Sequence, residues 1–145
     1  MNYYSSDPNK SDKFEANKNS VFSTLTELYN ALDEIGWCEY SVFSKEQWNN
    51  ENRCCGQCNA TVLLVQEYFG GEIVKYENPT GNKSMHYFNR IDGVDIDLTA
   101  RQFIPSLSQY NTEQKLYNPN GRNSFIYEKS AYILKLRLGL IKITE

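Results

Sequence analysis

The sequence lacks the features of membrane-spanning and nucleic-acid-binding proteins. No apolar run in its 145 residues approaches the roughly 20 residues that a transmembrane helix requires. The net charge is −3, whereas a nucleic-acid surface needs clustered Lys and Arg to neutralise phosphates. Residues 1–19 are polar and have no hydrophobic segment typical of a secretory signal. We therefore expect a cytoplasmic protein that binds neither membrane nor nucleic acid.

Cysteine and histidine are scarce, with four residues and one residue respectively. Three of the cysteines, Cys54, Cys55 and Cys58, lie within five positions. Adjacent cysteines make a poor disulfide framework, so we expect reduced thiols. The histidine is His86, and any imidazole chemistry in this chain must use it.

The length predicts one domain with a substantial core, over residues 20–145, after a polar and loosely ordered lead-in at 1–19. Apolar residues at three- and four-residue steps predict a helix from about 21 to 35. A capping-box pattern predicts a short helix over 44–48. The C-terminal segment 127–138 contains good helix formers, which favour a helix over a strand there.

The middle of the chain predicts a helix followed by antiparallel strands. A helix is expected to start near Gly56 and to end at Gly70-Gly71, a strong C-cap signal. A strand is expected over 72–77, and Asp92-Gly93 is typical of a two-residue hairpin turn. The fold class is therefore predicted as α+β, with a central helix that packs on a small antiparallel sheet.

Three residues of this region have the chemistry of a thiol enzyme. Cys58 is expected in the first turn of the central helix, where unpaired N–H groups and the helix dipole favour a thiolate. His86 lies in the first strand of the hairpin, and Asp97 lies at the end of the second. Chain lengths place the thiol and the open end of the hairpin at the same end of the domain.

The hairpin register gives a sharper test of this arrangement. With Asp92-Gly93 as the loop, Asp97 lies opposite Phe88 and is a diagonal neighbour of His86 on one face of the sheet. A shift of one residue would move Asp97 to the other face. The same register places Arg90 opposite Asp95, which predicts a salt bridge.

These residues predict nucleophilic catalysis. Cys58 would attack an amide or acyl carbon, His86 would transfer protons, and Asp97 would fix the imidazole tautomer. Gly56 and Gln57 would support the site, and backbone N–H groups near Gln57 and Cys58 would hold the oxyanion. We expect hydrolysis, deamidation or acyl transfer on a peptide or protein amide, without a metal or cofactor.

Ordered sequence blocks between Gly56 and Phe103 resemble the YunG-like family of small bacterial proteins. The matching blocks are 56–61, 70–73, 86–90, 93, 97–99 and 102–103. The Gly-Gln-Cys start is also similar to the transglutaminase-like and papain-like thiol-enzyme superfamily. The resemblance implies an α+β domain with Cys58 on a central helix and with His86 and Asp97 on the following antiparallel sheet.

Three other functions fit part of the pattern. Cys55 and Cys58 have the spacing of zinc ligands, and Cys38, Cys54 or His86 could complete a site; a second closely spaced ligand pair is missing from the sequence. The same Cys-x-x-Cys is also similar to a thioredoxin-type redox pair, but no clear apolar strand precedes it. A binding protein with this fold and no activity is the third alternative.

Overall fold

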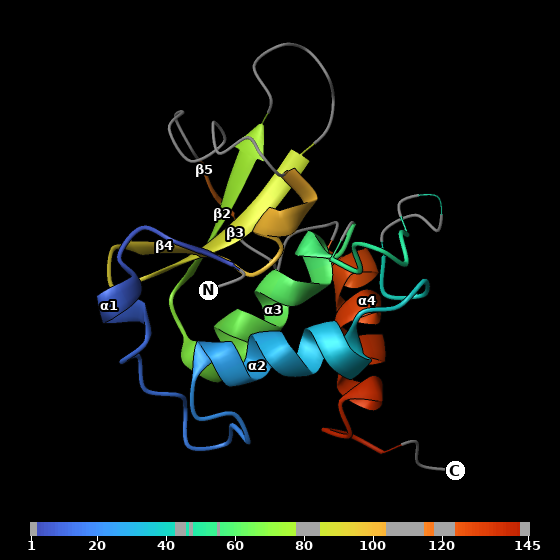
Figure 1. Cartoon of the computed structure of the whole chain (residues 1–145), viewed down its shortest axis with the longest axis horizontal. Coiled ribbons are helices and arrows are strands. Elements are labelled where there is room, and N and C mark those ends of the chain that lie inside the picture. The colour runs from blue at the N-terminus through green and yellow to red at the C-terminus, as the bar shows by residue number, and fades with distance from the viewer. Residues whose placement is uncertain are drawn as a thin grey trace.

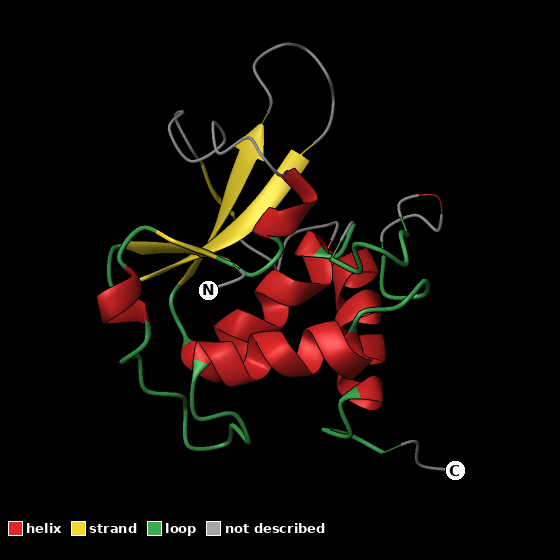
Figure 2. Cartoon of the chain, in the orientation of Figure 1, coloured by secondary structure: helices red, strands yellow, loops and turns green. Residues whose placement is uncertain are grey.

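The computed structural model describes residues 3–42, 46, 48–54, 56–77, 85–103, 115–117 and 124–142. Its fold is α+β, as predicted, and most helices gather on one side of the sheet (Figure 2). The helices are α1 (Pro8–Ser11), α2 (Leu25–Ala31), η1 (Leu32–Gly36), α3 (Cys58–Phe69), η3 (Ala100–Phe103) and α4 (Ser124–Arg137). The strands are β1 (Tyr4–Ser5), β2 (Glu72–Glu77), β3 (Met85–Ile91), β4 (Val94–Asp97) and β5 (Lys115–Tyr117). They form one antiparallel sheet in the order β1-β4-β3-β2-β5.

Part of the N-terminal segment, expected as a loosely ordered lead-in over 1–19, contributes to the sheet and to the core. Strand β1 pairs with β4, and Tyr4 lies opposite Asp97. Tyr3 is buried, with its ring centroid 5.4 Å from that of Tyr29 and its hydroxyl 3.0 Å from the Thr26 hydroxyl. A two-residue strand leaves no periodic pattern in the sequence, so its pairing was missed. The segment covers the edge of the strand that carries Asp97.

Helix α2 begins four residues later than the helix predicted from about 21 to 35. Thr24 is its N-cap, and the Thr24 hydroxyl accepts a hydrogen bond from the Glu27 N–H at 3.1 Å. The Glu27 carboxylate in turn accepts from the Ser23 N–H at 2.7 Å. These caps satisfy N–H groups at the helix start and so fix its position. The last turn, η1, is a π-helix that ends at Gly36.

Helix α3 has the predicted location and ends at glycine. Gly70 has a φ of 78°, and its N–H donates to the Gln66 carbonyl at 2.9 Å. At Gly71, a Cβ atom would lie 2.5 Å from the Arg90 carbonyl oxygen. The two glycines therefore let the chain reverse and pass close to β3.

Buried hydrogen bonds fix α3 in position between the sheet and the other helices (Figure 1). The Asn89 side-chain amide on β3 donates to the Val62 carbonyl at 3.0 Å. On another face of the helix, the Trp37 indole N–H donates to the Thr61 hydroxyl at 2.9 Å. The position of α3 is thus set by polar contacts as well as by apolar packing.

Other predicted elements have mixed outcomes. The C-terminal segment forms helix α4, as expected, and Leu134 on it is fully buried. Most of the short helix expected over 44–48 and Cys55 lie outside the described residues. Within the described ranges, none of the helices combines the length and apolar character needed to cross a membrane.

Candidate active site

Cys58 is the first residue of α3, as the sequence predicted. Gln57 is the N-cap residue, and its carbonyl accepts from the Thr61 N–H at 3.1 Å. Gly56, before it, has a φ of 76°, a left-handed conformation that suits glycine. Because the first N–H groups of a helix have no acceptor within the helix, the Cys58 sulfur lies beside the positive end of the α3 dipole.

His86 and Asp97 meet as the register predicted. Ile91 pairs with Val94 and Arg90 with Asp95, so continuing the register places Asp97 opposite Phe88. The Nε2 atom of His86 lies 2.5 Å from the Oδ2 atom of Asp97. Both residues are buried, with 2% and 1% of their surfaces exposed.

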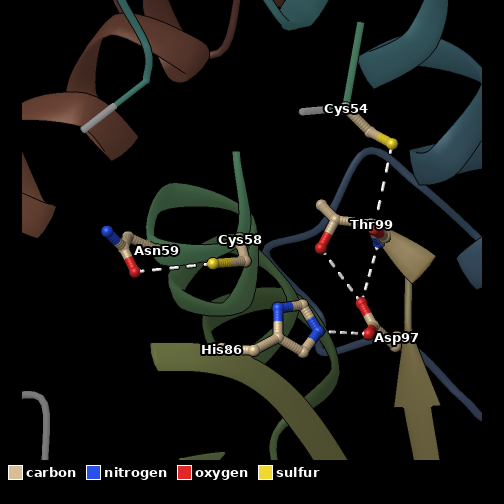
Figure 3. Close-up of polar contacts among 6 residues, drawn as sticks. All are labelled: Cys54, Cys58, Asn59, His86, Asp97 and Thr99. Carbon is tan, nitrogen blue, oxygen red and sulfur yellow. Dashed lines mark hydrogen bonds and ion pairs between the residues drawn. The ribbon is translucent and has the colours of Figure 1, made fainter. Parts of the chain in front are cut away.

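Thr99 holds the second oxygen of the Asp97 carboxylate. The Thr99 N–H donates to Asp97 Oδ1 at 2.9 Å, and the Thr99 hydroxyl donates to the same oxygen at 3.0 Å. Both carboxylate oxygens are therefore bound, one by the imidazole and one by Thr99 (Figure 3). The orientation of Asp97, and through it that of the imidazole, is fixed.

The imidazole of His86 lies between the carboxylate and the thiol (Figure 3). Burial acts to lower the pKa of His86, but the Asp97 charge and its hydrogen bond act to raise it. Hydrogen bonding and charge interaction with the Cys58 side chain also raise it, and the resulting pKa is about 10. His86 is therefore a cation at neutral pH, held between two groups that carry or develop negative charge.

The side chain of Gln57 faces the loop before α3. Its Oε1 atom accepts from the Ser41 hydroxyl at 2.6 Å, and its Nε2 atom donates to the Cys38 carbonyl at 2.9 Å. Its backbone N–H donates to the Cys54 carbonyl at 3.1 Å. Gln57 is fully buried, and its contacts join this loop to the start of α3. Of the predicted oxyanion donors, the Cys58 N–H is the one in the first turn of the helix.

Two residues at the site were not predicted as part of it. For Thr99 a signal is present, since its spacing of two from Asp97 is typical of a local side-chain–backbone bond. The other residue is Asn59, whose Oδ1 atom lies 3.6 Å from the Cys58 sulfur. The sequence gives no signal for Asn59. A residue directly after Cys58 lies in the helix whatever the role of its side chain.

Cys54 contacts Asn52 and Thr99. The Cys54 sulfur is fully buried, 3.0 Å from the Asn52 side-chain oxygen and 3.8 Å from the Thr99 carbonyl. Among the residues that the structure describes, no three His, Cys, Asp or Glu side chains are grouped to hold a metal ion. The zinc and redox alternatives both need Cys55, which lies outside the described residues.

The fold and the site together define a small α+β protein with a helix-start cysteine beside a buried His–Asp pair. Residues 24–137 match the model of the YunG protein family, and the chain belongs to this family. It is 41% identical over 64 residues to "Uncharacterized protein YunG" of Bacillus subtilis (strain 168). That match covers 44% of this chain and about half, 53%, of the relative. No solved structure matches the chain.

Proposed function

We propose that this protein is a cysteine-dependent hydrolase or acyltransferase that acts on an amide or acyl bond. The observation that supports the proposal is the buried imidazole of His86 between the Cys58 thiol and the Asp97 carboxylate. A nucleophile, a base and a group that orients the base, arranged in this order in space, are the three parts of a catalytic triad. The likeness to transglutaminase-like and papain-like enzymes, and a cytoplasmic location suited to reduced thiols, belong to the same proposal.

The first half of the reaction forms a thioester. The Cys58 thiolate attacks the carbonyl carbon, a C–S bond forms, and the carbonyl π electrons move to the oxygen. The Cys58 N–H donates a hydrogen bond to this oxygen. When the intermediate collapses, the C–N bond breaks and the His86 imidazolium gives its proton to the leaving amine. The raised pKa of His86 ensures that this proton is present at neutral pH.

The second half releases the acyl group. Water or an amine attacks the thioester carbon and gives a proton to the now neutral His86. The C–S bond then breaks, and the Cys58 thiolate and the His86 imidazolium are restored. Water as acceptor gives hydrolysis, or deamidation when the substrate is a primary amide, and an amine as acceptor gives acyl transfer.

The exposure of the three residues indicates the direction from which a substrate arrives. Cys58 has 7% of its surface exposed, whereas His86 has 2% and Asp97 has 1%. Cys58 is thus the most exposed of the three residues, and Asp97 is the most deeply buried. This order suits a nucleophile that contacts substrate and a carboxylate that binds its imidazole and Thr99 inside the protein.

Cys38 provides an internal control for a test of the triad. Its exposure, 8%, is nearly that of Cys58, and the chain contains no second imidazole to activate it. The native protein is treated with iodoacetamide at neutral pH, and the modified cysteines are mapped and timed by mass spectrometry. We expect Cys58 to react at least about tenfold faster than Cys38, because the thiolate is the nucleophile and the His86 imidazolium beside Cys58 stabilises it.

The variant His86→Gln should remove this difference while Cys38 keeps its slow rate. A rise in the Cys38 rate would show instead that the variant has unfolded, so the same measurement monitors folding. Equal rates at Cys58 and Cys38 in the native protein would overturn the triad and favour a binding protein without activity.

A further inference from the structure

Asn59, the second residue of α3, contacts the atom proposed as the nucleophile. Its side-chain amide lies 3.6 Å from the Cys58 sulfur. Figure 3 shows that Asn59 and His86 approach the sulfur from different directions. Asn59 is partly exposed, whereas His86 is buried, so the amide lies on the more accessible side of the thiol.

The chemistry of the thiol decides which end of this amide faces it. A neutral thiol donates its proton to Oδ1, but a thiolate has no proton and accepts hydrogen bonds. A half-turn of the amide exchanges Oδ1 and Nδ2, and so presents the NH₂ group to the sulfur. Because a protonated His86 favours the thiolate beside it, the donor end is the one that suits the active form.

An oxyanion next to this sulfur needs hydrogen-bond donors that are not already used. The Gln57 amide is bound to Ser41 and Cys38, and the Gln57 N–H is bound to the Cys54 carbonyl. These groups are committed to the loop before α3. Besides the Cys58 N–H, the Asn59 amide lies against the sulfur through its Oδ1 atom, and a half-turn of the amide would bring its NH₂ donor there.

We propose that Asn59 is a catalytic residue whose side-chain NH₂ stabilises the oxyanion formed when Cys58 attacks a carbonyl carbon. This inference rests on the proposed function. As the C–S bond forms, the carbonyl π electrons move to the oxygen, and Nδ2 shortens its hydrogen bond to that oxygen. The leaving group then departs with the electron pair of its bond to the carbonyl carbon, and the C=O bond is restored. The Asn59 amide returns to the sulfur.

The test compares two reagents that use the same thiolate. Iodoacetamide reacts by displacement of iodide at a saturated carbon, so no oxyanion forms. The activated ester p-nitrophenyl acetate transfers its acetyl group to the sulfur through an oxyanion and releases p-nitrophenolate, which is followed by its absorbance. The readout is the ratio of the acylation rate to the alkylation rate at Cys58 in the full chain.

We expect this ratio to fall at least about tenfold in Asn59→Ala and in the shape-matched Asn59→Leu, since loss of one oxyanion donor costs about 10²–10³ in rate. Gln66→Ala is the matched control, because it removes another part-buried amide from α3, about 12 Å along the helix from Cys58. Its ratio should remain that of the native protein.

The outcomes separate this inference from the proposed function. If native Cys58 is acylated in a His86-dependent way and both Asn59 variants keep the native ratio, the role of Asn59 is overturned and the triad stands. If native Cys58 reacts with neither reagent faster than Cys38, the triad is overturned and the role of Asn59 with it. Proportional loss of both rates in the Asn59 variants would show support of the thiolate alone and would also overturn an oxyanion role.

Discussion

The β3–β4 hairpin carries two acid–base pairs, one at each end. Near the turn, the Arg90 Nε atom lies 2.7 Å from Asp95 Oδ1. At the open end, the His86 Nε2 atom lies 2.5 Å from Asp97 Oδ2. The distances are similar, but the side chains of the first pair are 32% and 18% exposed, and those of the second are 3% and 1% exposed.

This difference in exposure gives the two pairs different roles. A partly exposed pair contributes little to stability, because water and salt screen it. In a buried pair every polar atom needs a hydrogen-bond partner. Here Thr99 donates to the carboxylate oxygen that the imidazole does not bind. The sequence pattern of the two pairs is alike, so it is burial, together with the neighbouring thiol, that distinguishes the candidate active site from the surface salt bridge.

The largest effect is expected when each acid is removed in turn. Asp97→Ala leaves a buried imidazole without its partner and should lower the free energy of unfolding by about 3–5 kcal/mol. Asp95→Ala, the matched control on the same strand, should lower it by at most about 1 kcal/mol. Urea unfolding followed by circular dichroism measures both. Equal losses would show that burial does not separate the two pairs.

A smaller effect is expected from pH, and its sign follows from the raised pKa of His86. The pKa is 6.5 for a free imidazole and about 10 in the fold. The stability that the pair contributes is therefore complete below pH 6.5, decreases as pH rises from there, and is lost once pH passes about 10.

The variant Asp97→Asn isolates this pH effect. It keeps the shape of the side chain but removes the charge. The unfolding free energy of the native protein should fall between pH 6.5 and pH 9 by at most about 1.4 kcal/mol per pH unit. That of the variant should fall by less. Asp95→Asn should keep the native dependence on pH. Parallel profiles of unfolding free energy against pH in Asp97→Asn and the native protein would show that Asp97 does not raise the pKa of His86. Asp97→Asn should also fold, and iodoacetamide should alkylate its Cys58 more slowly than that of the native protein.

Elements specified by short-range signals could be predicted from the sequence. The hairpin register follows from Asp92-Gly93, and this register was sufficient to bring His86 and Asp97 together. The end of α3 follows from Gly70, which provides the left-handed residue that a helix end needs. In both cases the deciding residues lie within a few positions of the feature they control.

Features that depend on distant parts of the chain could not be predicted. The pairing of Tyr4 with Asp97 joins two strands more than 90 positions apart, and neither has a pattern that identifies the other. The commitment of Gln57 to Ser41 and Cys38 depends on how a loop folds back onto α3. The start of α2 is different: Thr24 and Glu27 give a local capping signal, but apolar residues upstream of Thr24 continue the helical spacing and predict an earlier start.

The smallest effect is expected at Thr99, which is what makes the buried pair complete. Thr99→Val removes the hydroxyl but keeps the N–H, so Asp97 Oδ1 loses the hydroxyl donor and keeps the Thr99 N–H, at a cost of about 1.5 kcal/mol. Alkylation of Cys58 should slow by less than in Asp97→Asn, because the imidazole keeps its partner. Thr61→Val is the control, since it also removes a buried hydroxyl, one bonded to the Trp37 indole. It should lower stability without changing the alkylation rate, whereas equal rates in both threonine variants would show that the orientation of Asp97 does not depend on the Thr99 hydroxyl.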